Sequence, residues 1–346
     1  MTNLSLPARR RLLPAALALF TGLALAACSN VPAESAGAGG TVLNLVGFAV
    51  PAEANARIAQ AWEQTPEGAG VTFETSYGAS GDQSRNVLNG QPADYVHFSV
   101  ESDVTRLVDG GLVAEDWKSG PNHGIVSNSV VVFAVRPGNP LGITGWDDLV
   151  KPGVEIVTPN PASSGAARWN ILGAWAHIAA NGGTDEEATA FLTKIFENTV
   201  ALPGSGRDAT TAFTSGTGNV FITYENEAIL ARQSGEEFDY VVPEDTLLIE
   251  NPGAVLKDAD PKASQWLDFV LSDQGQEIFG EAGFRPLSGK APTEVKGAND
   301  PANPFPVPAK LYTVANDFGS WKELSDKFFA EQTGIVTGLL ASLGKS

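Results

Sequence analysis

The feature of this sequence that most constrains its fold is a turn rich in serine and glycine, which joins an apolar segment to a helical pattern. Residues 154–157 read as a short buried strand, and apolar side chains recur at helical spacing over residues 167–178. A helix is therefore predicted to begin at the Ser164-Gly165 pair. The N–H groups of a first helical turn have no partner within the helix, so they and the helix dipole attract an anion. Serine is also an ordinary helix cap, and for this turn alone capping is the more frequent explanation.

Two further stretches repeat this order of strand, turn and helix. Residues 76–83 (Ser-Tyr-Gly-Ala-Ser-Gly-Asp-Gln) and residues 203–210 (Pro-Gly-Ser-Gly-Arg-Asp-Ala-Thr) each precede a helical pattern. Such junctions lie at the carboxyl ends of parallel strands, where open α/β sheets bind their ligands. The three turns together predict one shared pocket for an oxyanion.

The first 27 residues are predicted to be a signal peptide. Arginines at positions 9–11 precede an apolar segment, residues 12–27, which ends in Leu-Ala-Ala before Cys28. This end resembles a bacterial lipobox, so Cys28, the only cysteine of the chain, is predicted to carry a lipid. Residues 28–40 read as a flexible tether. We therefore expect an extracytoplasmic protein, anchored by lipid to the cell membrane on its periplasmic face or at the cell surface.

The remaining chain is predicted to be an α/β protein with two lobes. Strand-like and helix-like segments alternate, which is typical of mostly parallel sheets flanked by helices, and the length of 346 residues suggests two cores. We expect residues 41–128 in a first lobe, 129–248 in a second, and 249–346 in the first lobe again with C-terminal helices. Such lobes close on a ligand in the cleft between them by hinge motion. Predicted helices include residues 103–108, 184–198, 225–233, 261–279 and 321–343, and predicted strands include 127–136, 240–243 and 252–256.

The composition argues against several functional classes. The formal net charge is −18, which disfavours nucleic acid, because that binding depends on contacts of Lys and Arg with phosphate. The negative charge still allows an anion pocket, since exposed charges are screened beyond about 8 Å at physiological salt. After the leader, no apolar run reaches the ~18 residues of a membrane span. His97, His123 and His177 lack metal-ligand spacing, so neither a metal nor a cofactor is expected.

Three motifs together point to a known family. They are residues 78–81 (Gly-Ala-Ser-Gly), 156–170 (Ile-Val-Thr-Pro-Asn-Pro-Ala-Ser-Ser-Gly-Ala-Ala-Arg-Trp-Asn) and 224–228 (Tyr-Glu-Asn-Glu-Ala). With residues 305–321, they resemble the periplasmic sulfate-binding proteins, the receptors of sulfate and thiosulfate ABC importers, over nearly all of the mature chain. The resemblance implies a type II two-lobed periplasmic-binding-protein fold and delivery of sulfate, or of thiosulfate, to an ABC permease. We expect the protein to be a monomer.

The resemblance also implies which groups contact the ligand. That family binds its dianion through uncharged donors, most of them backbone N–H groups at helix starts. By position, the donors would be the hydroxyl of Ser164 and the N–H groups of Ala49, Ser80, Gly165, Ala166 and Gly206. Tyr224 stands where the family has a tryptophan, and its phenolic O–H can also donate. Ala49 replaces the family's usual Asp, so the contact is preserved if the main chain makes it and the site is looser if the side chain matters. Ala166 replaces the family's second glycine; it still offers an N–H group, with less backbone freedom.

Charged residues near the turns are expected to support the site or to alter its preference. Arg168 and Arg207 lie in the first turns of two predicted helices, where each could bond backbone carbonyls or Asp94 behind the site; an ordinary surface position is the alternative. Asp82 and Asp208 lie close to the turns in sequence. Either could enter the pocket as a hydrogen-bond acceptor.

Other ligands and one other class of protein remain as alternatives. Sulfate only accepts hydrogen bonds, whereas hydrogen phosphate also donates one, so a pocket without an acceptor rejects phosphate. Phosphate, molybdate and tungstate, which are also tetrahedral oxyanions, are the alternative ligands. A lipoprotein serine hydrolase is the alternative class. Neither Ser80 nor Ser164 lies in a Gly-x-Ser-x-Gly motif or beside a base, so we expect no enzymatic activity.

Overall fold

In the computed structural model, which describes residues 40–345, ten strands connect into one mixed β-sheet. Their order is β2-β1-β3-β9-β4-β7-β5-β6, with β10 paired to β9 and β8 paired to β4. The strands are β1 (Thr41–Phe48), β2 (Val71–Gly78), β3 (Tyr95–His97), β4 (Ile125–Val135), β5 (Ile156–Val157), β6 (Thr199–Ala201), β7 (Val220–Tyr224), β8 (Asp239–Val241), β9 (Asp245–Val255) and β10 (Lys310–Tyr312). The predicted signal peptide, Cys28 and all but the last residue of the predicted tether lie outside the described residues.

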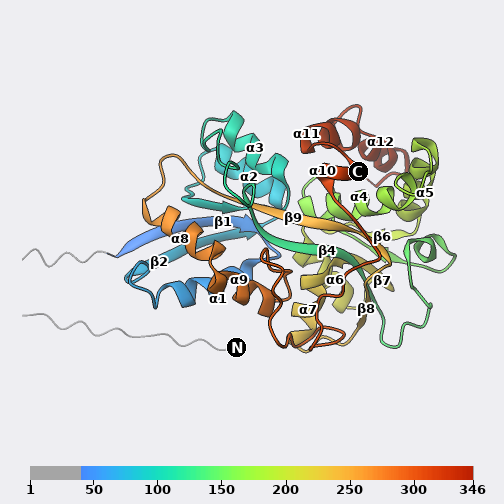
Figure 1. Cartoon of the computed structure of the whole chain (residues 1–346). Coiled ribbons are helices and arrows are strands. Elements are labelled where there is room, and N and C mark those ends of the chain that lie inside the picture. Colours follow the sequence, from blue (N-terminus) through green and yellow to red (C-terminus); the bar gives the residue numbers. More distant parts are fainter. Residues whose placement is uncertain (1–39, 346) are drawn as a thin grey trace, which may run out of the picture. The chain divides into compact units, whose positions relative to one another are not determined.

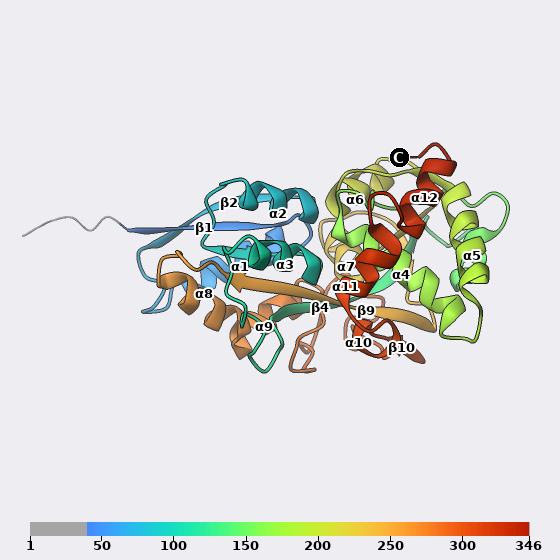
Figure 2. The ribbon, with the colours of Figure 1, turned by 90° about the horizontal axis from the view of Figure 1, so that it is seen from above.

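Helices cover the sheet in two groups, which form the two lobes. Figures 1 and 2 show β1 and β2 with α1, α2, α3, α8 and α9 in one lobe, and α4 to α7 around the far end of the sheet in the other. The helices are α1 (Ala52–Trp62), α2 (Ser80–Leu88), α3 (Glu101–Asp109), α4 (Gly165–Ala179), α5 (Asp185–Glu197), α6 (Gly206–Thr214), α7 (Glu225–Gln233), α8 (Lys262–Leu271), α9 (Asp273–Glu281), α10 (Val314–Asp317), α11 (Trp321–Leu324) and α12 (Ile335–Ser342), with a 3₁₀ helix at Trp146–Val150 and a π-helical turn at Ser325–Phe329. Among the described residues, no helix is long and apolar enough to cross a membrane.

Two long neighbouring strands, β4 and β9, run from one lobe to the other (Figure 1). They pair antiparallel with each other over residues 125–130 and 248–252. Beyond this stretch β9 pairs with β3 in the first lobe, and β4 pairs with β7 in the second. Within the lobes, β1 lies parallel to β2 and β3, and β5 lies parallel to β6 and β7. The parallel pairing predicted from the alternating pattern therefore holds inside each lobe, and the connecting strands are antiparallel.

The apolar sequence of β4 follows from burial on both faces of the sheet. Val131 and Phe133 belong to one hydrophobic core, which also contains Trp146, whereas Val130 and Val132 belong to a second core. Successive side chains of a strand point to opposite faces, so helices on both sides require an apolar residue at nearly every position. The side chains of β4 thus pack into a hydrophobic core on each face of the sheet.

The helix predicted over residues 261–279 is in fact two helices, α8 and α9. Ser272 between them has an extended backbone, with φ −67° and ψ 162°, and its hydroxyl accepts a hydrogen bond from the N–H group of Gly275 at 3.2 Å. The prediction was wrong because apolar spacing continues across the break. A serine cap followed by an acidic residue, here Asp273, is a helix-start signal that outweighs this spacing.

The predicted C-terminal helix, residues 321–343, is also interrupted. After α11 and the π-helical turn, the backbone becomes extended at Ala330, and α12 begins only after Gly334. The end of the chain packs on the second group of helices: the rings of Trp321 and Trp169 meet edge to face at 4.8 Å, and α12 contacts α5. The assignment of residues 249–346 to the first lobe, like the other lobe boundaries, stays a prediction.

Two strands differ from the sequence prediction. β9 begins at Asp245, seven residues before the predicted strand over 252–256. The prediction was wrong because proline rarely lies inside a strand, whereas Pro252 is accommodated within β9 at an irregularity in the pairing with β4. Strand β7 was not predicted, since its five residues lead directly into α7. The helix predicted over residues 225–233 is confirmed as α7.

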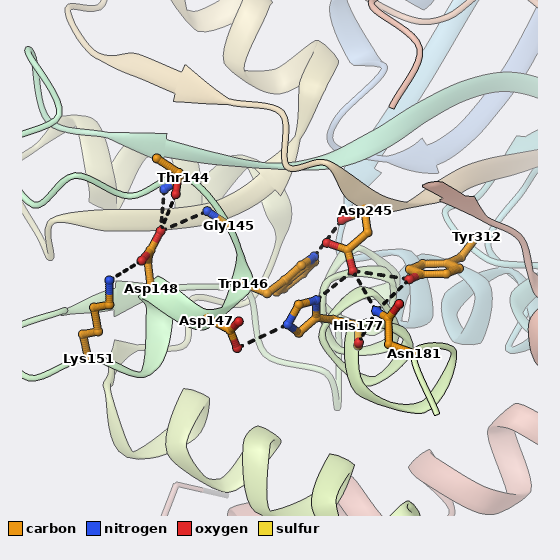
Figure 3. A network of polar contacts seen from close by, with 10 residues as sticks. All are labelled: Thr144, Gly145, Trp146, Asp147, Asp148, Lys151, His177, Asn181, Asp245 and Tyr312. Carbon is orange, nitrogen blue, oxygen red and sulfur yellow. Dashed lines mark hydrogen bonds and ion pairs between the residues drawn. The ribbon is translucent and has the colours of Figure 1, made fainter. Parts of the chain in front are cut away.

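His177 of α4 belongs to a polar network that also includes the 3₁₀ helix, β9 and β10 (Figure 3). Its Nδ1 atom lies 2.7 Å from Oδ2 of Asp245 at the start of β9, and its Nε2 atom lies 3.3 Å from Oδ1 of Asp147. Tyr312 of β10 donates to the same Asp245 oxygen at 3.3 Å. Burial lowers the pKa of His177, but the hydrogen bonds and charges of the two carboxylates outweigh it, so the net pKa is raised. The histidine is a structural residue, as its lack of metal-ligand spacing indicated.

Candidate oxyanion-binding site

The predicted ligand-binding turns all follow the carboxyl ends of strands. Strand β2 ends at Gly78 and α2 begins at Ser80; β5 is followed by α4, which begins at Gly165; β6 is followed by α6, which begins at Gly206. Strand β7 ends at Tyr224, directly before α7. The serine- and glycine-rich stretches therefore lie at the first turns of helices, where the predicted site would place them.

Contacts between the turns bring these helix starts together. The N–H group of Gly81 donates to the carbonyl of Ser163 at 3.0 Å, and the hydroxyl of Ser163 donates to the carbonyl of Gly204 at 2.7 Å. A Cβ atom added at Gly206 would lie 3.4 Å from Cβ of Ala166. The starts of α2, α4 and α6 thus lie next to one another, as a shared pocket requires.

Several uncharged donors at this junction have no internal acceptor. Within residues 40–345, the N–H groups of Ser80, Gly165, Ala166 and Gly206 form no hydrogen bond, and neither does the hydroxyl of Ser164. Ser80 and Ser164 are each only 2% exposed. Buried donors without partners are costly, so their grouping favours a ligand that only accepts hydrogen bonds.

Ala49 differs from the predicted donors. Its N–H group donates to the carbonyl of Gly78 at 2.9 Å, because the pairing of β1 with β2 continues one residue past Phe48. In this structure the N–H group of Ala49 is therefore bonded within the protein, contrary to the prediction that it donates to an anion.

Tyr224 lies at the centre of the junction and is 1% exposed. Its hydroxyl is 2.7 Å from the hydroxyl of Ser99, and either of the two can be the donor. Burial raises the pKa of Tyr224 far above its usual value, although hydrogen bonds with Ser99 and Asn251 oppose this, so the phenol keeps its proton. The O–H group predicted as a donor is therefore present.

Ser99 is a residue of the site that the sequence prediction missed. Its N–H group donates to Oγ of Ser80 at 2.9 Å, and its carbonyl accepts from the indole of Trp169 at 2.8 Å and from the Asn251 amide at 2.9 Å. A Cβ atom added at Gly165 would lie 2.7 Å from Cβ of Ser99. Ser99 follows the end of β3 without a glycine-rich turn, so only its position at a strand end could have indicated it.

Arg207 supports the junction in the way predicted for it. Its Nη2 atom donates to Oε1 of the buried Glu227 at 2.7 Å and to the carbonyl of Val50 at 3.2 Å. The hydroxyl of Thr210 donates to the other oxygen of Glu227 at 2.7 Å. The arginine thus ties the start of α6 to α7 and to the turn after β1.

Asp94 does not bond either arginine. Its carboxylate accepts from the backbone N–H groups of Asn44 at 2.7 Å and of Asp260 at 3.0 Å, so it connects β1 with the loop before α8. Arg168 instead makes long contacts to Oγ of Ser102, at 3.3 Å, and to the carbonyl of Pro161, at 3.5 Å. The predicted role of Asp94 behind the site is therefore wrong.

The acidic residues near the junction are engaged elsewhere. Asp82 pairs with Arg85, and both side chains are about half exposed; Asp208 accepts from the hydroxyl of Ser205 at 2.8 Å. The buried Asp103 accepts from the hydroxyl of Ser80 at 2.7 Å, which leaves only the N–H group of Ser80 for a ligand. The junction thus offers donors without acceptors, and each of these carboxylates already bonds a neighbouring protein group.

Comparison with known proteins agrees with this combination of fold and site. The chain belongs to the bacterial extracellular solute-binding proteins, whose family profile matches residues 43–285. A sulfate-binding protein of Synechococcus elongatus is 41% identical over 92% of each chain, and a thiosulfate-binding protein of Pseudomonas aeruginosa is 34% identical over 79% of this chain and 83% of its own. Within the class, the chain belongs to the family of the sulfate-binding proteins.

Solved structures place the fold in the same group. The sulfate-binding protein SubI from Mycobacterium tuberculosis is 43% identical, with a TM-score of 0.78 over 84% of this chain and all of that chain. The periplasmic binding protein AfuA from Actinobacillus pleuropneumoniae, at 20% identity and a TM-score of 0.64, shares the fold. The two-lobed fold is therefore that of the periplasmic binding proteins.

Proposed function

We propose that this protein captures sulfate outside the cytoplasm and delivers it to the permease of an ABC importer. The observation that carries this proposal is the buried group of uncharged donors at Ser80, Ser164, Gly165, Ala166 and Gly206. Such donors at helix starts stabilise a dianion without a cationic side chain. The similarity to sulfate- and thiosulfate-binding proteins supports the same ligand class.

The preference for sulfate over phosphate follows from hydrogen-bond chemistry. Hydrogen phosphate needs an acceptor for its proton, and the carboxylates of Asp82, Asp103 and Asp208 are bonded to other groups. A hydroxyl can accept as well as donate, so a protonated anion could find an acceptor at the hydroxyl of Ser164 or at the hydroxyl pair of Tyr224 and Ser99. We expect sulfate to bind more tightly than phosphate, and these hydroxyls to limit the difference.

A thermal-unfolding panel tests the proposal. Purified protein is dialysed against sulfate-free buffer and heated with sulfate, thiosulfate, molybdate, tungstate or phosphate. Sulfate at a hundred times its Kd should stabilise the folded state by about 2.7 kcal/mol, with a smaller effect of phosphate. Equal stabilisation by phosphate would contradict the assigned preference, and no stabilisation by any of the five anions would contradict the proposed site.

The proposal includes attachment to the membrane through a lipid on Cys28, and binding without enzymatic turnover. The lipobox-like sequence before Cys28 supports the anchor. Metabolic labelling with a clickable fatty acid should mark the wild type and leave Cys28→Ser unlabelled and released from membranes. Labelling of the Cys28→Ser protein would contradict the assignment.

A further inference from the structure

A cavity lies next to the first turn of α4 and is lined by other residues than the proposed sulfate donors. It has a volume of about 520 Å³ and lies between α2, α3, the segment before α4 and the C-terminal helices. A volume of this size is typical of pockets for small organic ligands, which span roughly 300–1,000 Å³. The cavity is therefore larger than an inorganic oxyanion requires.

Three guanidinium groups line this cavity in a protein whose net charge is −18. Arg85 pairs with Asp82, and Arg106 donates to Asp103 at 2.9 Å. Arg168 has no carboxylate partner within residues 40–345, and its hydrogen bonds are the two long contacts at 3.3 and 3.5 Å. Arg168 is partly exposed, and its two long contacts leave guanidinium N–H groups available for an anionic group within the cavity.

The C-terminal segment contributes the apolar part of the wall. Phe329 packs against the guanidinium of Arg168, with the ring centroid 4.8 Å from Cζ, and Val336 and Leu340 of α12 extend the apolar surface. The hydroxyl of Ser325, also in the wall, is buried and has no hydrogen-bond partner among the described residues.

Two carboxylates also reach the cavity wall, from the exposed side. Asp326 and Glu331 are both exposed, and Asp326 pairs with Lys322 at 2.8 Å. Their charges are therefore screened by water more strongly than the charge of Arg168, which is only partly exposed. The anionic end of a ligand is expected at the arginine side of the cavity.

We propose that this cavity binds a small organic anion whose acidic group pairs with Arg168 and whose apolar body contacts Phe329, Val336 and Leu340. Arginine binds a carboxylate through two parallel hydrogen bonds, which gives such a site both affinity and orientation. The proposal does not depend on the assignment of sulfate to the first site.

Calorimetry with octanoate as the probe tests the proposal. The purified protein is saturated with sulfate and titrated with octanoate, and separately with octan-1-ol, which has the same apolar body without the charge. One equivalent of octanoate should bind at least about tenfold more tightly than octanol. Arg168→Gln should weaken octanoate to a similar degree, and Thr337→Trp, which fills the cavity without changing its charge, should do the same. Ala341→Trp, an exposed position of the same helix that does not line the cavity, is the matched control.

Four results would overturn the proposal. They are an absence of octanoate binding, equal binding of octanol, unchanged octanoate binding by Thr337→Trp, and a second equivalent of sulfate that Thr337→Trp abolishes. The last result would assign the cavity to an inorganic anion instead. Because Thr337→Trp retains all three arginines, it tests the cavity even if Arg168→Gln does not fold.

Discussion

Replacing Gly165 by alanine should weaken sulfate binding by preventing close approach of the two lobes. The added Cβ atom would lie 2.7 Å from Cβ and 2.8 Å from Oγ of Ser99, well inside the ~3.5–4.0 Å of favourable contact. Overpacking of this kind costs about 1–3 kcal/mol, which corresponds to a roughly 5- to 150-fold loss of affinity. Gly165 begins α4 and Ser99 lies in the predicted first lobe, so opening of the lobes relieves the clash. The unliganded protein should therefore keep its stability.

The assay is titration calorimetry with sulfate, together with thermal unfolding of the sulfate-free protein. Gly338→Ala is the matched control, because this helical glycine has open space around its Cβ position and should leave sulfate binding unchanged. Combining Gly165→Ala with Ser99→Gly removes both clashing atoms and should restore much of the affinity. Unchanged sulfate affinity in Gly165→Ala would refute the reasoning, because the lobes would then bind the anion without the contact seen here.

Three further changes test other parts of the molecule. Ser164→Ala should weaken sulfate by roughly 1–2 kcal/mol through loss of a hydrogen bond to a charged ligand; wild-type affinity in calorimetry would remove this hydroxyl from the site. Glu225→Ala should lower the free energy of unfolding by about 3 kcal/mol, since it removes the buried carboxylate that pairs with Arg285, a side chain only 14% exposed, at 2.7 and 3.0 Å; a loss below about 1 kcal/mol in urea titration would contradict this. His177 has a raised folded-state pKa, so its pairing with Asp245 stabilises fully below about pH 6.5 and fades as pH rises through the folded value. The wild type should then lose more stability than His177→Gln between about pH 6 and pH 9, and equal losses would argue against a charged pair.

The local order of strand, turn and helix was predictable because it depends on neighbouring residues. The start of α4 at Gly165 and of α6 at Gly206 follows from a serine cap before a periodic apolar pattern. The convergence of these starts follows from parallel pairing, which places the carboxyl ends of strands at one edge.

What the sequence could not indicate depends on contacts between distant segments. The N–H group of Ala49 donates to the carbonyl of Gly78, because the pairing of β1 with β2 continues to the last residues of both strands. Asp94 bonds backbone groups 50 and 166 positions away instead of an arginine. Ser99 lacks a glycine-rich turn, and its place in the site arises from Ser80, Trp169 and Tyr224 together.

The connection between the lobes has a consequence for how such a receptor opens. Strands β4 and β9 cross side by side and remain hydrogen-bonded to each other, and β9 continues the sheet into β3 while β4 continues it into β7. A two-stranded ribbon can bend and twist without breaking its ladder, but it cannot swivel freely as a pair of glycine-rich linkers would. The lobes would then open by elastic bending of this ribbon, through a limited angle, to release the anion. Amide protons of residues 127–130 should stay slow to exchange in the open form as well as in the closed one.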